Sequence, residues 1–262
     1  MKRLKILLLA LLALVSVGAS AQAMNNTAFR SGEILTYNLY FNWKFVWIKA
    51  GNATYSTVQT RFQGQNAYRS SLTATTNARA DKFFTIRDNL TAYCTTNMLP
   101  LYYTKSTHEG DRRNLDEVRY SFSGGRCNMR LRRRKSDGSN HYRNISLNNS
   151  FDMINAFMRA RQWGISNWRT GSKVVFNIVD GKNSSPAYIQ YLGKTTVEGD
   201  NGHKYRALKL TYFEKTGKGY KRIATFYVSD DRNHIPVLIE LNLKFGSAKA
   251  KVVSIRGNRY PM

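Results

Sequence analysis

The sequence NSFDMINAFMRARQW, residues 149–163, decides the fold that we expect, because it is the one stretch with a convincing helical pattern. Four apolar residues recur at spacings of three and four and so share one side of a helix: Phe151, Ile154, Phe157 and Met158. Ser150 is placed to cap the first turn, and Asp152 lies where the helix dipole favours an anion. Arg159 and Arg161 fall toward another side. The apolar side must be buried, so we expect the helix to pack against a sheet.

Nearly all of the remaining sequence reads as strand and turn. Residues 36–43 alternate apolar and polar, and Gly124-Gly125 is a hairpin signal between two further strands. About a dozen such strands follow one another at hairpin spacing. We therefore expect a mainly β protein with one large curved antiparallel sheet or open β-barrel, and one central α-helix packed against it. Gly51, in mid-strand, predicts a bulge or the close approach of another element, conceivably the helix.

The N-terminus has the pattern of a secretory signal peptide. Lys2, Arg3 and Lys5 precede an apolar run at residues 6–15, and small residues follow at 19–23. We expect cleavage after residue 21, so that residues 1–21 are a signal peptide and residues 22–262 form a single β-rich domain. An uncleaved anchor is the competing interpretation. The predicted location is periplasmic or secreted, and it is compatible with peripheral membrane contact.

The chain is strongly basic, with 41 Lys and Arg against 16 Asp and Glu and a formal net charge of +25. A positive surface of this kind suits phosphates, acidic glycans and anionic lipid head groups. The alternative is that the basic residues keep an exported β protein soluble and protect the edges of its sheet. Composition leaves both interpretations open.

One predicted strand concentrates the positive charge. Arg130, Arg132 and Arg134 alternate along it, so their guanidinium groups share the face opposite Cys127, and can present forked donors to a series of phosphates or carboxylates. If the predicted hairpin forms, four more arginines on its two strands extend this surface: Arg112, Arg113, Arg119 and Arg126. We expect the partner to be an anionic envelope lipid or glycan, because an exported chain rarely meets nucleic acid and no nucleic-acid module is recognisable. A solvated strand face is the alternative.

Aromatic residues crowd the first two predicted strands. Tyr37, Trp43 and Trp47 are candidates for lining a cavity that holds an acyl chain or another small amphiphile. Ordinary core packing is the competing explanation. The sequence gives no indication of the oligomeric state.

Cys94 and Cys127 are the two cysteines of the chain. Each shares a strand face with apolar residues, so either a disulfide or two buried thiols would fit. The four histidines are scattered beside predicted turns, and no catalytic or phosphate-binding motif is present. We therefore expect no metal, no cofactor and no catalytic residues.

Several short motifs together resemble the exported bacterial family called domain of unknown function 3108. They are Gly32-Glu33-x-Leu35-x-Tyr37, Ala50-Gly51-x-Ala53, Asp152-x-Ile154-Asn155-Ala156-Phe157 with Arg161, Ser229-Asp230-Asp231, Ile235-Pro236-Val237 and Phe245-Gly246-Ser247. The resemblance implies a periplasmic β-rich domain without an established enzymatic activity. The leading hypothesis is thus a non-catalytic envelope protein that binds an anionic amphiphile or polymer. The alternatives are an envelope glycan or lipid hydrolase, and a structural partner in an envelope assembly.

Overall fold

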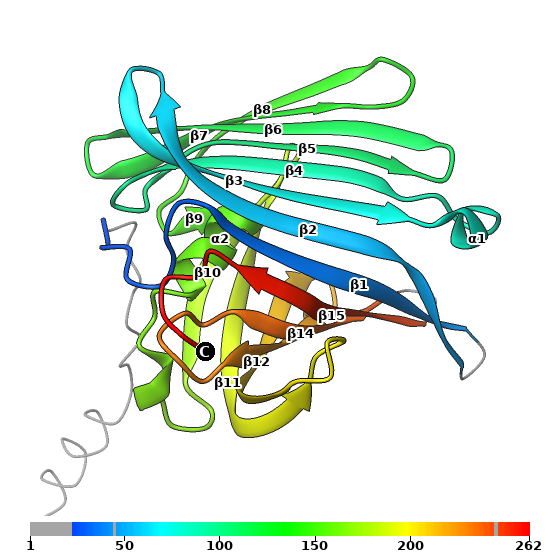
Figure 1. Cartoon of the computed structure of the whole chain (residues 1–262). Coiled ribbons are helices and arrows are strands. Elements are labelled where there is room, and N and C mark those ends of the chain that lie inside the picture. Colours follow the sequence, from blue (N-terminus) through cyan, green and yellow to red (C-terminus); the bar gives the residue numbers. More distant parts are fainter. Residues whose placement is uncertain (1–22, 44–45, 244–245) are drawn as a thin grey trace, which may run out of the picture.

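A computed structural model describes residues 23–43, 46–243 and 246–262 of the chain. The predicted signal peptide, residues 1–21, lies outside the described residues. Within them, one continuous sheet accounts for most of the chain, and Figure 1 shows how strongly that sheet curves.

The sheet has fifteen strands in the part of the chain that the structure describes. They are β1 (Glu33–Trp43), β2 (Val46–Phe62), β3 (Gln65–Thr76), β4 (Arg87–Thr95), β5 (Pro100–Glu109), β6 (Arg112–Ser123), β7 (Arg126–Arg134), β8 (Asn140–Ser146), β9 (Ser150–Phe151), β10 (Lys173–Val179), β11 (Ser184–Glu198), β12 (Lys204–Thr216), β13 (Gly219–Ser229), β14 (Pro236–Asn242) and β15 (Ser247–Arg256). Two α-helices, α1 (Ala78–Asp81) and α2 (Met153–Ala160), and a short 3₁₀ helix, η1 (Ile165–Asn167), accompany them.

The strand order runs from β8 down to β1, continues with β15 and then runs down to β9. Every pair of neighbours is antiparallel except β9 and β10, which are parallel. The first and last strands therefore pair in the middle of the sheet, with Ile34 opposite Arg256. The two ends of the sheet belong to the middle of the chain. This arrangement confirms the predicted mainly β fold with one large curved antiparallel sheet.

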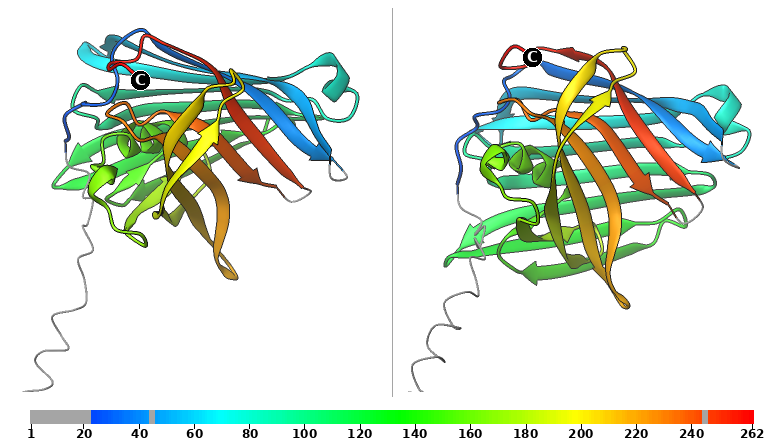
Figure 2. Two further views of the ribbon diagram at one scale, coloured as in Figure 1. Left: turned by 60° about the horizontal axis from the view of Figure 1, so that its bottom comes forward. Right: turned by 90° about the horizontal axis from the view of Figure 1, so that it is seen from below.

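The curved sheet closes on itself through a turn. The turn between β10 and β11 reaches strands at the opposite end of the sheet: Asp180 lies 3.2 Å from the guanidinium of Arg133, and Arg143 donates to Asn183 at 2.7 Å. Gly181 is required there, because a Cβ at this position would lie 2.3 Å from the carbonyl oxygen of Arg132. Side chains and a turn, not a strand ladder, join these ends, and the result is an open barrel (Figure 2).

The helix α2 is shorter than the predicted 149–163. Ser150 and Phe151 are held extended as β9 by pairing with Asn177 and Ile178 of β10, so the helix begins after them. The N-cap is Asp152, whose carboxylate accepts from the backbone N–H groups of residues 154 and 155 at 3.1 and 2.9 Å. The prediction of a Ser150 cap is wrong, because a strand pairing outweighs the local capping preference.

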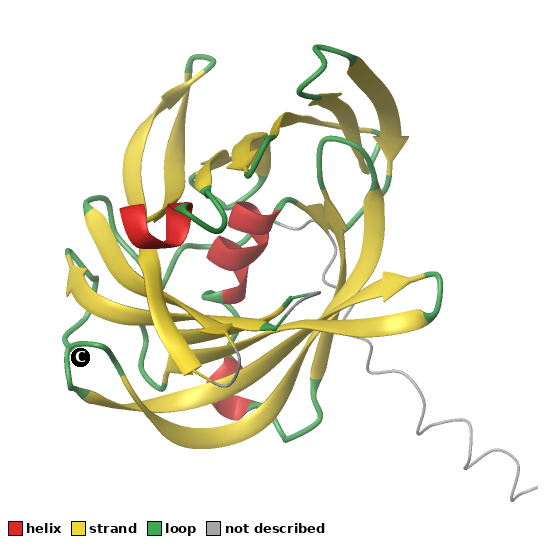
Figure 3. Cartoon of the chain, turned by 90° about the vertical axis from the view of Figure 1, so that its right-hand side faces the viewer, coloured by secondary structure: helices red, strands yellow, loops and turns green. Residues whose placement is uncertain are grey.

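Helix α2 lies inside the curve of the sheet, as Figure 3 shows. Ile154 and Met158 pack into a core to which β1 to β7 and also β10, β12, β14 and β15 contribute apolar side chains. Ala156 packs instead into a second cluster with β10, β11 and β12. Because the helix is covered from two directions, Arg159 and Arg161 are buried as well, at 4% and 2% exposure. The prediction of a single buried side, with the arginines apart from it, is therefore wrong.

Gly51 satisfies both expectations drawn from it. The pairing of β1 with β2 steps from Leu39–Gly51 to Tyr40–Lys49, which leaves Ala50 as a bulge. A Cβ on Gly51 would also lie only 2.0 Å from the carbonyl oxygen of Thr75. The close neighbour is thus strand β3, and not the central helix.

Candidate functional site

The arginine-rich strand β7 lies beside β6 in a register that brings two arginines together. Arg130 pairs directly with Arg119 of β6, and Arg132 pairs with Glu117. Arg132 Nη1 lies 2.7 Å from Glu117 Oε2, whereas the guanidinium of Arg119 reaches the same carboxylate only at 3.9 Å. Arg130 has no ion pair among the described residues. The register therefore places two arginines opposite each other on one face of the sheet, and the nearest carboxylate, Glu117, is closer to Arg132 than to Arg119.

Tyr102 of β5 supports this arrangement from the next strand. Its hydroxyl donates to Glu117 Oε1 at 2.6 Å, and the guanidinium of Arg119 lies 5.0 Å from the centre of its ring. Burial and the hydrogen bond to Glu117 raise the pKa of Tyr102 to about 12. Burial alone would raise the pKa of Glu117, but the donors Tyr102 and Arg132 lower it. Glu117 is thus an ionised anchor that holds the surrounding side chains in place.

These side chains border a shallow depression of about 280 Å³. We call its polar lining the arginine face, which consists of Arg119, Arg130, Arg132, Glu117 and Tyr142. Tyr142 of β8 pairs with Arg132 and is 68% exposed. The arginine face combines three guanidinium groups, one carboxylate and an accessible aromatic ring. This set suits a ligand that carries phosphate or carboxylate groups.

The other arginines predicted for the site lie outside the depression. Arg134 follows Arg132 on β7, is exposed and has no ion pair among the described residues. Arg112 and Arg113 begin β6, about 20 Å along the strand from Arg119 at the usual rise per residue. The structure therefore gathers Arg119, Arg130 and Arg132, and leaves Arg112, Arg113 and Arg134 on the surrounding surface.

The predicted aromatic residues do not form a common ligand cavity. Tyr37 is a core residue with 5% exposure, and its hydroxyl donates to the carbonyl of Pro236 at 3.0 Å, so core packing explains it. Trp47 is 39% exposed, with Lys249 Nζ 4.4 Å from the centre of its ring. Trp43 ends β1, and its side chain is outside the described set.

Trp47 borders a second depression of about 460 Å³ that also contains Glu198 and Asp200. Asp200 accepts hydrogen bonds from the amide of Asn38 and, at 2.8 Å, from the hydroxyl of Tyr40. Burial raises the pKa of Asp200, but these two donors outweigh it and lower the pKa. An ionised, fully engaged carboxylate is a poor general acid or base. Asp200 therefore fixes the β11–β12 turn and is a poor candidate for the acid or base of the hydrolase alternative.

The two cysteines are free thiols, and both are buried. Cys94 lies on β4 and Cys127 on β7, with β5 and β6 between them in the sheet. Three strand spacings correspond to roughly 14 Å, which is too far for a disulfide. Burial raises the pKa of Cys94 to about 12 and that of Cys127 to about 11. Of the two sequence alternatives, buried thiols are correct.

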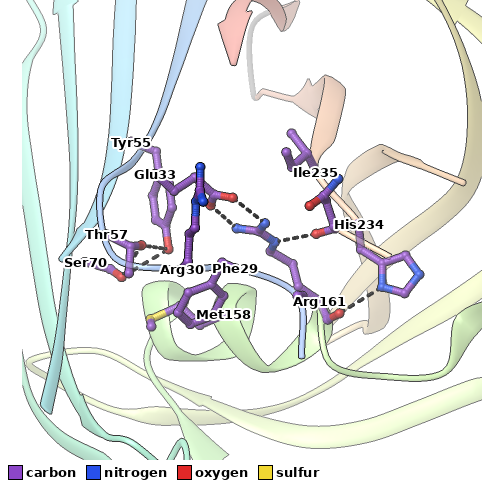
Figure 4. Close-up of polar contacts among 12 residues, drawn as sticks. Phe29, Arg30, Glu33, Tyr55, Thr57, Ser70, Met158, Arg161, His234 and Ile235 are labelled. Atoms are coloured by element: carbon purple, nitrogen blue, oxygen red, sulfur yellow. Dashed lines mark hydrogen bonds and ion pairs between the residues drawn. The ribbon is translucent and has the colours of Figure 1, made fainter. Parts of the chain in front are cut away.

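Sequence reasoning missed a buried ion pair beside α2. Both Nη atoms of Arg161 donate to the Glu33 carboxylate, at 2.5 and 2.8 Å, and its Nε donates to the carbonyl of Asn233 at 3.0 Å (Figure 4). The imidazole Nδ1 of His234 contacts the Arg161 carbonyl at 2.8 Å. Burial would lower the pKa of Arg161, but Glu33 outweighs it and raises the pKa. The sequence does contain a sign of this ion pair. Glu33 is a charged residue two positions before Leu35, so both side chains lie on the inward face of β1.

A second buried group surrounds the start of α2. The hydroxyl of Tyr120 donates to Asp152 Oδ2 at 2.9 Å and accepts from the Asp152 backbone N–H at 2.8 Å. Arg159 donates to the carbonyl of Met98 at 2.9 Å and lies over the ring of Phe151, 4.6 Å from its centre. Burial lowers the pKa of Arg159 to about 10. These polar groups are enclosed, so they position the helix and are not accessible to a ligand.

Among the residues described, no three His, Cys, Asp or Glu side chains lie close enough to hold a metal ion. None of the described helices has the length and apolar character that crossing a bilayer requires. The fold and the site together define a class of protein: an open, curved antiparallel β-barrel around one central helix, with an arginine face on the sheet.

The chain belongs to the family described as protein of unknown function DUF3108, whose model matches residues 36–253. This match confirms the resemblance found in the sequence. No curated protein matches the chain.

Solved structures similar to this chain share little sequence with it. A beta-barrel-like protein of domain of unknown function DUF1849 from Brucella abortus has a TM-score of 0.58 at 10% identity, over 87% of this chain and 98% of that one. This likeness supports the fold alone. An exported protein with a YmcC-like fold from Bacteroides fragilis has a TM-score of 0.38 at 12% identity, over 89% and 99% of the two chains. A lipoprotein from Parabacteroides distasonis has a TM-score of 0.39 at 9% identity, over 90% and 100%.

Proposed function

We propose that this protein is a non-catalytic envelope protein that binds anionic groups of an amphiphile or polymer at its arginine face. The observation that carries the proposal is the direct pairing of Arg119 with Arg130. Like charges opposite each other destabilise an antiparallel pair. An anion held between the two guanidinium groups would remove this repulsion and accept charge-assisted hydrogen bonds from both.

The location proposed for this function follows from the predicted signal peptide, which directs the chain into the bacterial envelope. Envelope anions with closely spaced charges include the phosphates of lipid A and the carboxylates of acidic polysaccharides. Both present planar or tetrahedral oxygen groups that match the fork of a guanidinium. The net charge of +25 would steer such polyanions toward the protein.

Tyr142 adds a further element to the proposed binding surface. It is paired with Arg132 across β7 and β8, and most of its side chain is exposed. Its ring offers an apolar face beside three guanidinium groups, which suits a charged sugar better than an isolated phosphate ion. The proposed ligand class is therefore a glycan or glycolipid that carries phosphate or carboxylate groups.

Isothermal titration calorimetry tests the proposal with two probes, purified lipopolysaccharide and a soluble acidic polysaccharide without lipid. The test variant is Arg119→Ala/Arg130→Ala. The matched control is Arg222→Ala/Arg256→Ala, which removes the same charge from exposed positions on β13 and β15. We expect the test variant to lose about ten- to a hundredfold in affinity, as for two solvent-exposed hydrogen bonds worth about 0.7–1.4 kcal/mol each, and the control less than about threefold.

The two probes distinguish the source of the anion. Binding of lipopolysaccharide alone would indicate lipid A, and binding of the soluble polymer would indicate the polysaccharide. Equal losses in both variants would contradict the proposal, because they would show attraction by net charge only. Failure of the wild-type protein to bind either probe would contradict it as well.

A further inference from the structure

Exposed apolar side chains gather at one end of the barrel, away from the arginine face. We call them the apolar rim; with their exposures they are Val46 (60%), Trp47 (39%), Phe83 (81%), Phe84 (51%), Leu241 (36%) and Leu243 (43%). This end is the right-hand one in Figure 1, where helix α1 and the adjoining ends of β2 and β15 lie on the same side of the barrel. Apolar side chains that gather at one place on a surface usually mark an interaction site.

The sheet topology brings these residues together. The β1–β2 and β14–β15 hairpins are neighbours, because β1 pairs with β15 up to Phe41 opposite Ala248. Val46 and Leu243 therefore lie on adjacent hairpins at the same end. Helix α1 is tied to β2 beside them, since Asn77 makes a backbone hydrogen bond to Ala50 at 2.8 Å.

The segment that carries Phe83 and Phe84 is held in a defined conformation. The side chain of Asn77 caps α1 by accepting from the N–H of Ala80 at 2.9 Å. The backbone N–H groups of Phe83 and Phe84 both donate to the carbonyl of Ala80 at 2.9 Å. Arg87 fixes the last residue of the helix, Asp81, through an ion pair of 2.5 Å. The fold thus maintains both phenyl rings at the surface.

Basic residues surround the apolar rim. Lys49, Arg79 and Lys82 are exposed on β2 and around α1. Two of the acids beside the rim form ion pairs: Asp81 with Arg87, and Glu240 with Lys249 at 3.2 Å. Glu109 and Glu198 are exposed acids near Phe84 and Trp47, and Glu109 lies opposite Arg112 in the β5–β6 pairing. Exposed aromatic and aliphatic side chains flanked by Lys and Arg are typical of surfaces that enter the head-group region of anionic membranes.

We propose that the apolar rim inserts into the interfacial region of a bilayer that contains anionic phospholipids, so that the barrel stands on the membrane by this end. The side chains project from separate hairpins and a loop, an arrangement that suits a fluid interface better than the flat surface of a protein partner. The arginine face, on β6 to β8, does not contribute to this contact. The inference goes beyond the proposed function and does not depend on it.

Vesicle co-sedimentation tests the inference. The probes are vesicles of phosphatidylcholine alone and vesicles with roughly a third of phosphatidylglycerol, which supplies the anionic surface. The test variant is Phe83→Ser/Phe84→Ser/Leu243→Ser. The matched control, Val175→Ser/Leu192→Ser, removes side chains that are 52% and 41% exposed on β10 and β11, away from the rim.

The wild-type protein should bind the anionic vesicles more strongly than the neutral ones. The test variant should lose at least about tenfold in partitioning, as expected for three exposed apolar side chains withdrawn from a membrane, whereas the control should keep its binding. Circular dichroism establishes that each variant is folded. Equal partitioning of the test variant and the wild type would overturn the inference.

Tryptophan quenching by brominated phospholipids gives a second measurement. Quenching should be clearly weaker in Trp47→Phe than in the wild type, because Trp47 lies in the rim. The Arg119→Ala/Arg130→Ala variant should still bind the vesicles, so failure of the proposed function and failure of this inference can be told apart. If sedimentation velocity shows dimers that the rim variant abolishes, while vesicles are not bound, the rim joins two copies of the chain and the membrane inference is wrong.

Discussion

Arg161 beside α2 and Arg130 on β7 show two opposite uses of the same side chain. Arg161 is 2% exposed, and Glu33 neutralises it through two hydrogen bonds. Arg130 is exposed and lies opposite another arginine. The first arginine fixes the central helix inside the barrel, and the second leaves its positive charge available at the surface. The net charge of the chain therefore says less about binding than the immediate neighbours of each charge.

The largest effect should come from the buried arginine. Arg161→Met leaves the Glu33 carboxylate buried without its counter-ion, so we expect a loss of about 3–5 kcal/mol in the free energy of unfolding. Urea denaturation followed by circular dichroism measures the loss. The double variant Glu33→Met/Arg161→Met should be more stable than Arg161→Met, because no buried charge remains. If Arg161→Met were as stable as the wild type, Arg161 would have no structural role, and the contrast with Arg130 would fail.

A smaller loss is expected at the other end of α2. Tyr120→Phe removes the hydroxyl that both donates to the Asp152 carboxylate and accepts from its backbone N–H. We expect a loss of about 1–3 kcal/mol, since two buried polar groups lose a partner. Urea denaturation compares it with Tyr142→Phe, whose hydroxyl is on an exposed residue and should change stability little. Similar losses in both variants would contradict the structural role of the buried pair.

The next effect on stability, smaller than that of Tyr120→Phe, concerns a half-buried carboxylate on β4 and depends on pH. Burial, and next the charge of Glu109, raise the pKa of Asp88 to about 6, and its Oδ1 has no hydrogen-bond partner among the residues that the structure describes. Because the folded-state pKa is raised, the stabilising contribution of the protonated form is present below about pH 4 and is lost as the pH rises through about 6.

Asp88→Asn should therefore become more stable relative to the wild type as the pH rises from about 4 to 7. We expect a relative gain of about 1 kcal/mol, after allowance for solvent screening of a partly exposed group. Denaturation curves across this pH range provide the measurement. A difference between variant and wild type that does not change with pH would contradict the raised pKa.

The smallest effect on stability should come from the exposed arginine. Arg130→Ala should change the free energy of unfolding by less than about 0.5 kcal/mol, and relief of the repulsion from Arg119 makes a slight gain the expected direction. The gain should shrink in high salt, which screens surface charges. A loss comparable to that of Arg161→Met would show that Arg130 has a structural role, and the contrast between the two arginines would fail.

Local sequence patterns predicted which residues of a strand face the core and which face outward, because this depends only on the two-residue period of the strand. Alternation along β7 correctly placed Arg130 on the face opposite the buried Cys127. The extent of α2 could not be predicted in this way, because β10, far along the chain, holds Ser150 and Phe151 in a strand. A capping preference worth about 1 kcal/mol does not outweigh such a pairing.

Local patterns also could not predict which residues contact each charged side chain. Glu33 and Arg161 are 128 positions apart in the chain, and only the complete fold brings them into contact. The arginines of β7 were recognised as a row, but the sequence did not show that Glu117 pairs with Arg132, while Arg130 has no ion pair within the described part of the chain. Register between strands decided which of the predicted arginines came together in the arginine face.

The pairing of β1 with β15 has a consequence for how the molecule assembles. Each half of the sheet, β1 to β8 and β9 to β15, is a meander of sequence neighbours, so each can form from local contacts. A single long-range ladder then joins the halves, and it cannot form until the last strand has been synthesised. Two separately produced fragments, divided between β8 and β9, should accordingly recognise each other and reconstitute the barrel. A circular permutant that starts at β9 should fold with every strand beside its neighbour in sequence.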